Sequence, residues 1–225
     1  MSADAEPDDF TLHDYWRSSA SYRVRIGLNL KGLRYAQKPV HLVRNGGEQH
    51  GAEHHALNPM DAVPVLVHGA NVIRQSLAIL EYLDEVAGPA APRLLPVDPL
   101  ARARVRSLAL LIACDVHPLN NLRAMQYLER ELGAAADVRE TWMRHWMAEG
   151  FRAFEALLAT DAATGLCCHG DTPTLADACL IPQVYNANRF GVDLAPFPTI
   201  RRVNEHCLSL PAFDAARPER QPDAA

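Results

Sequence analysis

Apolar and polar positions alternate over residues 10–87 in a way that predicts a small α/β domain. The expected order is strand–helix–strand, followed by strand–strand–helix. A serine before the first helix and Gly32 after it fit the residue preferences of helix ends. A loop that begins at Asn45 is expected to be mobile. The predicted strands are Phe10–Tyr15, Tyr35–Val43, Val63–Val67 and Asn71–Ile73, and the predicted helices are Ser19–Lys31 and Gln75–Val86.

The rest of the chain has the pattern of a helical domain. Prolines concentrate just after the α/β region, which predicts a linker there. Thr174–Asp177 fits a capping box, in which a threonine hydroxyl and an acidic side chain satisfy the first N–H groups of a helix. Long helices are expected at Leu100–Leu132, Asp137–Ala159, Thr174–Arg189 and Thr199–Ser209. The expected organisation is an acidic disordered tail over 1–9, a domain over 10–87, a linker over 88–98 and an all-helical domain over 99–225.

Composition narrows the class of protein. Apolar residues make up 48% of the chain, enough for a sizeable core. Acidic residues in the first nine positions account for four of the five net negative charges, so neither nucleic acid nor an anionic membrane surface is an expected partner. No segment approaches the roughly 20 apolar residues that span a bilayer. The five cysteines are irregularly spaced and form no CxxC motif, which predicts no metal site and favours a reducing, cytoplasmic location.

Three segments carry candidate chemistry, and each also has a plain structural explanation. Arg17-Ser18-Ser19 opens the first helix, where free N–H groups favour an anion and a serine hydroxyl can donate to a thiolate. Helix capping alone also accounts for these serines. Val63–Pro64 precedes a strand and is a candidate cis peptide bond, although a trans bond is the ordinary expectation before proline. Gln75–Ser76 opens the next helix, where an anion site and a simple cap are both possible.

In this order and spacing, the segments resemble the zeta-class glutathione transferases, the family of maleylacetoacetate and maleylpyruvate isomerases. The resemblance covers residues 10–223, nearly the whole chain. It rests on Arg17-Ser18-Ser19-x-Ser21-x-Arg23-Val24-Arg25-Ile26, Leu57-Asn58-Pro59-Met60-x-x-Val63-Pro64, Gln75-Ser76-Leu77-Ala78-Ile79-x-Glu81-Tyr82-Leu83, Gly170-Asp171-x-Pro173-Thr174-Leu175-Ala176-Asp177, Pro182-Gln183-Val184 and Arg220-Gln221-Pro222-Asp223. Many family members have a cysteine where this chain has Ala20, which argues against a thiol-transferase activity because that chemistry needs a protein thiolate.

The resemblance implies a thioredoxin-like N-terminal domain that binds glutathione and an all-α C-terminal domain that binds the substrate. In this family the residue matching Ser18 stabilises the glutathione thiolate, with Ser19 beside it. The backbone of Val63, before a cis Pro64, pairs with the cysteinyl part of glutathione. The implied glutathione contacts also include Gln75 and Ser76 on the γ-glutamyl carboxylate and Gln49 and His50 near the glycyl end.

A maleyl keto acid carries two carboxylates, so its site needs cations, preferably arginines. His117 and Asn121 are four residues apart, which puts both on one helix face, and Arg123 can reach the same pocket from its edge. A kinked helix with a solvated polar face explains this segment equally well, since Pro118 interrupts it. The resemblance implies that these residues bind the acid together with Arg17 and Arg189.

The resemblance further implies a homodimer and a reaction in which the glutathione sulfur adds to the cis double bond, allows rotation, and leaves. Arg17 or Arg189 would stabilise the developing negative charge. The product is the fumaryl isomer, and the pathway is the breakdown of aromatic amino acids or other aromatic compounds. Two alternatives use the same fold. One is a transferase that conjugates glutathione to small electrophiles such as haloacids, and the other is a non-catalytic partner-binding protein.

Overall fold

The computed structural model describes residues 9–224 of the 225-residue chain. The acidic tail predicted over residues 1–9 therefore lies almost wholly outside the described residues. The chain divides into two compact units, one formed by residues up to Leu94 together with residues from Leu210 onward, the other by Leu95–Ser209. The segment after Leu210 thus joins the first unit, whereas the sequence-based division placed it in the helical domain.

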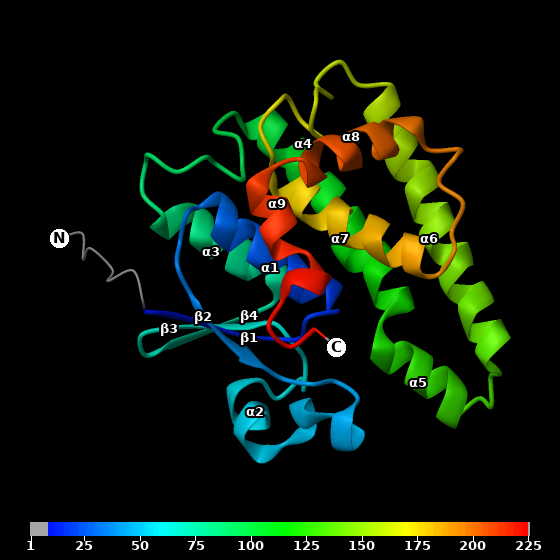
Figure 1. Cartoon of the computed structure of the whole chain (residues 1–225). Helices are drawn as coiled ribbons and strands as arrows, with labels where there is room; N and C mark the ends of the chain where they lie inside the picture. The colour runs from blue at the N-terminus through cyan, green and yellow to red at the C-terminus, as the bar shows by residue number, and fades with distance from the viewer. Residues whose placement is uncertain (1–8, 225) are drawn as a thin grey trace. The chain divides into compact units, whose positions relative to one another are not determined.

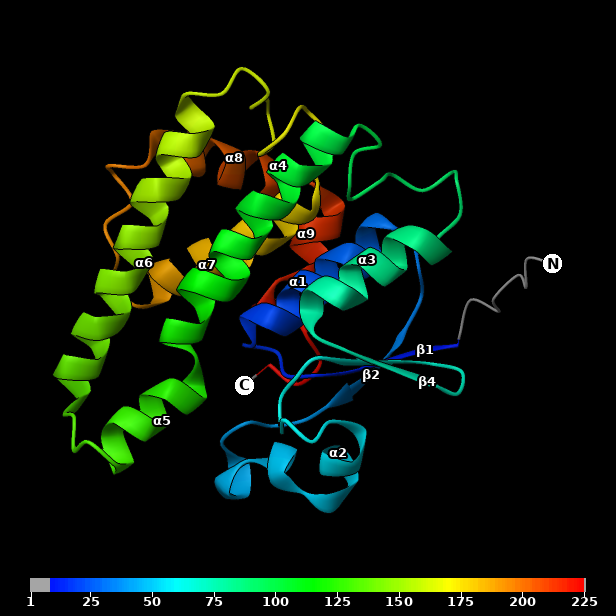
Figure 2. The same cartoon turned by 180° about the vertical axis from the view of Figure 1, so that it is seen from behind.

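The first unit is a four-stranded sheet with helices on both of its faces (Figure 1). The strand order is β2-β1-β3-β4, with β2 parallel to β1 and the other pairs antiparallel. Helices α1 and α3 lie on one face and α2 on the other, as both views show (Figure 2). The elements are β1 (Phe10–Asp14), α1 (Ser19–Leu30), β2 (Ala36–Pro39), α2 (Ala52–Leu57), β3 (Val65–His68), β4 (Asn71–Arg74), α3 (Ser76–Val86) and α9 (Pro211–Ala216), with 3₁₀ turns at Arg44–Gly46, Glu48–His50 and Pro218–Arg220.

A buried apolar cluster joins this sheet to α1 and α3. Its fully buried members are Phe10, Leu12, Val24, Leu28, Leu66, Ile79 and Leu83. The two helices approach closely at Gly27, where an added Cβ would lie 2.2 Å from Cδ2 of Leu80. This close contact packs α1 directly against α3, and the first residues of both helices belong to the segments with candidate chemistry.

The predicted hairpin and helices of this unit are confirmed, with ends shifted by one or two residues. The Val63–Pro64 bond is cis, as the resemblance to the zeta class implied. The region from Asn45 onward, which was predicted as a loop, contains two 3₁₀ turns and the helix α2.

The second unit consists of helices, as predicted. Its elements are α4 (Pro99–Leu110), a π-helical turn (Leu111–Val116), a 3₁₀ turn (His117–Asn120), α5 (Leu122–Arg130), α6 (Ala136–Ala159), α7 (Leu175–Arg189) and α8 (Pro198–Leu208). The prediction of one continuous helix over Leu100–Leu132 is wrong. Pro118 has no N–H to donate, and Asn121 caps a new helix by accepting the N–H of Arg123. Among residues 9–224, no helix combines the length and apolar character needed to cross a bilayer.

Candidate active site

Three backbone segments of the first unit meet at one end of the sheet. In the β1–β3 register His13 lies opposite Val65, so the chain just after β1 runs alongside Val63–Pro64. In the β3–β4 register Val65 lies opposite Arg74, so Gln75 and α3 begin beside the same two residues. The turn that leads from β1 into α1, the cis peptide bond and the start of α3 are therefore neighbours. The fold brings together the segments that sequence analysis had identified separately.

Ser18 occupies the N-cap of α1. Its Oγ accepts the N–H of Ser21 at 3.2 Å, and its own N–H donates to the carbonyl of Tyr15. A hydroxyl has two acceptor positions and one donor position, so the cap leaves the O–H of Ser18 able to donate to an anion. The side chain is half-buried, which leaves it accessible to a ligand. Capping and anion binding are therefore compatible roles for this serine.

The Arg17 side chain packs against the two aromatic residues that precede it in the sequence. Its guanidinium lies 4.9 Å from the centre of the Trp16 ring and donates to the Tyr15 hydroxyl at 3.2 Å. Tyr15 is only 5% exposed, and its ring meets that of His41 edge-on. The arrangement holds a positive charge beside the N-terminus of α1 and makes Tyr15 a packed aromatic residue.

The start of α3 combines an unusual backbone with a buried arginine. Gln75 has φ 70° and ψ 118°, a conformation that non-glycine residues seldom adopt, and its side chain does not cap the helix. Ser76 is buried, and its Oγ accepts a hydrogen bond from the Arg23 guanidinium of α1 at 3.2 Å. Together, the helix end and Arg23 make this corner electropositive and suited to a carboxylate.

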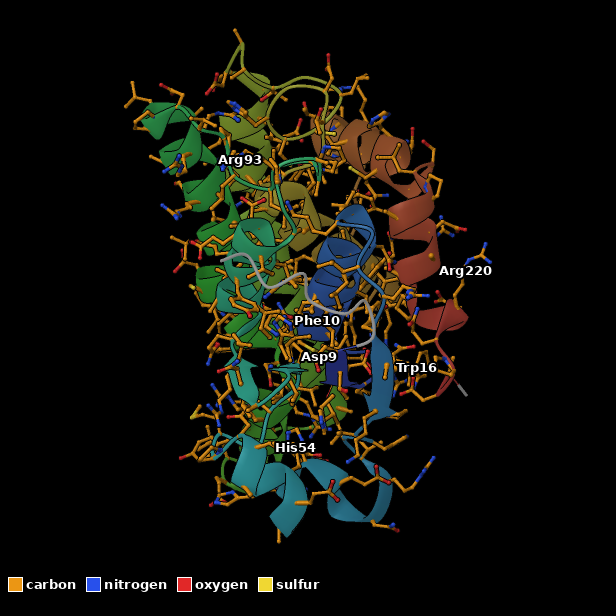
Figure 3. The ribbon with its side chains drawn as sticks, turned by 90° about the vertical axis from the view of Figure 1, so that its left-hand side faces the viewer. Asp9, Phe10, Trp16, His54, Arg93 and Arg220 are labelled. Atoms are coloured by element: carbon orange, nitrogen blue, oxygen red, sulfur yellow. The ribbon has the colours of Figure 1, made fainter. Side chains whose placement is uncertain are left out.

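Helix α2, which sequence analysis did not anticipate, holds the chain just before the cis bond. The Ala62 carbonyl contacts His54 Nε2 at 3.1 Å and accepts from Asn58 Nδ2 at 2.8 Å. His54 is buried and is labelled in Figure 3. These contacts fix the backbone that leads into Val63.

Gln49 and His50 lie in the 3₁₀ turn before α2. Gln49 is 5% exposed, and its Nε2 lies 3.1 Å from His50 Nε2, while its buried Oε1 has no hydrogen-bond partner among the described residues. His50 Nδ1 lies 2.9 Å from Asp61, whose other carboxylate oxygen is 2.7 Å from Nδ1 of His55. A buried amide oxygen without a donor fits a site that receives an N–H or O–H from a ligand.

The contacts to Asp61 predict a measurable titration. Hydrogen bonds from His50 and then from His55 lower the pKa of the Asp61 carboxyl below 3.8. Since the folded-state pKa is depressed, these contacts add stability that is present above the ordinary carboxyl pKa and is lost as the pH falls through the folded value. We expect NMR titration to show the low pKa, and both His50→Ala and His55→Ala to raise it. An Asp61 pKa that neither replacement moves would contradict the arrangement.

The candidate substrate residues of the second unit form a capped turn rather than a helix face. His117 Nε2 and Asn121 Nδ2 are 3.3 Å apart, so the two side chains meet as expected, although the intervening residues are a 3₁₀ turn. Arg123 is exposed at the start of α5. Arg189 is exposed in the last turn of α7, with its guanidinium 4.8 Å from the centre of the Phe190 ring.

One buried group in the second unit has the residue types of a metal site, which the sequence had not suggested. Ligand atoms of Cys167, Asp177 and Cys207 all lie within 4.8 Å of one another. However, both oxygens of Asp177 already accept hydrogen bonds from Thr174 and from the Cys168 N–H. The geometry therefore matches the predicted capping box, which is confirmed.

Comparison with known proteins gives a consistent result. Residues 8–85 match the family described as glutathione S-transferase, N-terminal domain. A probable maleylacetoacetate isomerase of Vibrio cholerae is 51% identical over 213 residues, which cover 95% of this chain and 97% of the relative.

Two solved structures superimpose on nearly the whole chain. One is a holo structure of a maleylpyruvate isomerase, described as a bacterial glutathione S-transferase of the zeta class, with 48% identity and a TM-score of 0.92 over 96% of this chain and 100% of that one. The other is a maleylacetoacetate isomerase from Methylobacterium extorquens AM1 with bound malonate and glutathione, with 41% identity and a TM-score of 0.91 over 96% and 99% of the two chains.

Proposed function

This chain belongs to the zeta-class glutathione transferase family, and we propose that it is a glutathione-dependent isomerase that converts a maleyl keto acid to its fumaryl isomer. The observation that carries the proposal is the meeting of Ser18, the cis Val63–Pro64 bond and the start of α3 at one end of the sheet. Each of these segments offers a different part of glutathione a complementary group.

The residues present fit glutathione. The O–H of Ser18 and the N-terminus of α1, where Ser19 is the first helical residue, favour the thiolate over the thiol. Ser76, Gln75 and the N–H groups of α3 hold the γ-glutamyl carboxylate, with Arg23 behind Ser76.

The remaining contacts hold the rest of the tripeptide. The backbone of Val63, ahead of Pro64, takes the cysteinyl unit. Gln49 and His50 take the glycyl end, where the buried Oε1 of Gln49 needs a donor.

Bound glutathione supplies a thiolate that can add to a conjugated double bond, permit rotation and leave again. The chain's own residues serve that chemistry in two ways. Ser18 keeps the sulfur deprotonated at neutral pH, and Arg17 or Arg189 supplies positive charge where the substrate oxygen becomes negative. The Arg17 guanidinium is already held beside the start of α1 by its contacts with Tyr15 and Trp16.

The substrate is a dicarboxylic keto acid, either maleylacetoacetate or maleylpyruvate. The Methylobacterium relative has been crystallised with malonate, a small dicarboxylate, together with glutathione. In this chain His117, Asn121, Arg123 and Arg189 supply the polar and cationic groups that such an acid needs. The proposal includes a cytoplasmic homodimer that acts in aromatic catabolism.

The test is an optical assay with each of the two maleyl keto acids, in the presence and absence of glutathione. We expect conversion to the fumaryl isomer only when glutathione is present, and the two rates identify the preferred acid. Failure to convert either acid, with glutathione bound, would contradict the proposed reaction and favour a conjugating transferase.

A further inference from the structure

The C-terminal segment, residues 210–223, is held against the helix that opens the active site. Helix α9 contacts α1, where Asn29 Nδ2 donates to the Ala212 carbonyl at 2.9 Å and Arg25 Nε donates to the Ala216 carbonyl at 3.1 Å. Phe213 is completely buried. Figure 1 shows α9 beside α1, and the end of the chain returning toward the end of β1.

The last residues of this segment contact the turn that connects β1 to Ser18. The Trp16 N–H donates to Asp223 Oδ2 at 3.1 Å, across 207 residues of sequence (Trp16 is labelled in Figure 3). The Trp16 carbonyl accepts from the Arg25 guanidinium at 2.8 Å. Side chains therefore hold both polar groups of the Trp16 backbone, directly before Arg17 and Ser18.

A buried polar network links the C-terminal segment to β1, β2 and α1. Asp14 and Arg25 are both fully buried and form an ion pair at 2.8 Å. Gln37 Nε2 donates to Asp14 Oδ2 at 3.3 Å and to Gln221 Oε1 at 2.9 Å. Gln221 Nε2 donates in turn to the carbonyls of Ala215 and Arg217. Burial raises the pKa of the Asp14 carboxyl, Arg25 partly offsets this, and the nearby Asp223 raises it further.

We propose that Asp223 is a positioning residue for the reaction, acting through Trp16 to fix the turn that presents Ser18. The inference rests on the proposed function, since Ser18 matters there as the thiolate partner. A hydrogen bond from a backbone N–H to a carboxylate is stronger than one between neutral groups. Loss of the hydrogen bond between the Trp16 N–H and Asp223 removes a restraint on the turn at Trp16, just after the end of β1. Small displacements of a reacting group are costly in rate.

The test compares Asp223→Ala with two matched variants. Asp223→Asn keeps an oxygen that can accept from the Trp16 N–H. Glu219→Gln removes one negative charge from the same segment at an exposed side chain. Gln221→Leu provides a second way to loosen the segment, because it removes the amide that Gln37 contacts.

The readout is the pKa of the thiol of bound glutathione, followed by ultraviolet absorption of the thiolate, alongside kcat and KM. Asp223→Ala is expected to raise that pKa by about one unit and to lower kcat by about tenfold, with a smaller change in KM for glutathione. Gln221→Leu changes both values in the same direction. Glu219→Gln stays close to the unchanged chain, whereas Asp223→Asn falls between it and Asp223→Ala, because the amide oxygen still accepts from the Trp16 N–H but carries no charge.

Equal thiol pKa values in the unchanged chain, Asp223→Ala and Gln221→Leu would overturn the positioning role, as would an equal loss in Glu219→Gln. The thiol pKa can be measured without any keto acid. Glutathione binding without isomerisation therefore overturns the proposed reaction alone, and absence of glutathione binding by the unchanged chain overturns both.

Discussion

Replacement of Ser18 by alanine is expected to lower glutathione-dependent turnover by about 100-fold, the cost of removing one well-placed donor to a reacting anion. The Ser18 oxygen already accepts the Ser21 N–H, so its proton is the group left for the glutathione sulfur. Ser18→Thr keeps the hydroxyl and is expected to retain most of the activity. Steady-state kinetics with saturating glutathione provide the measurement.

The same replacement removes a helix cap, so its effect on stability needs a separate control. Loss of an N-cap costs about 1 kcal/mol. Asp98 caps α4 by accepting the Ala101 N–H at 2.8 Å, so Asp98→Ala gives a matched loss of a cap in the second unit. We expect similar losses of stability from the two alanine variants, and loss of turnover only at Ser18. Equal loss of turnover in both would show that the hydroxyl acts only as a cap.

Replacement of Asp177 by alanine is expected to destabilise the protein by about 3–5 kcal/mol, because buried N–H donors are left without an acceptor. Asp177 is completely buried and accepts from the backbone N–H groups of Thr174 and Cys168 and from the Thr174 hydroxyl. A loss of that size is a large share of the stability of an ordinary domain. Urea unfolding followed by tryptophan fluorescence measures it.

Asp171→Ala is the matched control for this prediction. Asp171 lies in the loop before the same helix, is exposed, and accepts the Leu166 N–H at 2.9 Å. Its loss is expected to cost about 1 kcal/mol or less, since water can replace the missing acceptor. Equal unfolding midpoints for Asp177→Ala and Asp171→Ala would contradict the role given to the capping box.

Features with a short-range signal could be predicted from the sequence. The capping box at Thr174–Asp177 spans four residues, and the chemistry of each end is visible in the residue types. The hairpin after Val63–Pro64 is likewise marked by local residues, whereas the cis form of that bond was implied only by the family resemblance. The serine at the start of α1 was also identified from local residues. Local patterns thus located the Ser18, Val63 and Gln75 segments of the candidate site.

Features that depend on contacts distant in sequence could not be predicted. Helix α2 has only six residues and follows a glycine, and its role in holding Ala62 becomes visible only when the chain is folded. The contact between Trp16 and Asp223 joins the two ends of the chain. Arg25 reads as a polar position on α1, yet it is completely buried and joins β1, α1 and α9. A hydrophobic pattern gives no signal for an arginine that is buried with its partners.

An isomerase uses glutathione and returns it unchanged, so a count of free thiol during turnover separates isomerisation from conjugation. The purified protein is given glutathione and an excess of maleylpyruvate or maleylacetoacetate, and free thiol is measured as the fumaryl product accumulates. We expect many molecules of product for each molecule of glutathione, with the free thiol unchanged at the end. Loss of one thiol for each molecule of keto acid consumed would contradict the proposed isomerisation and would identify a conjugating transferase.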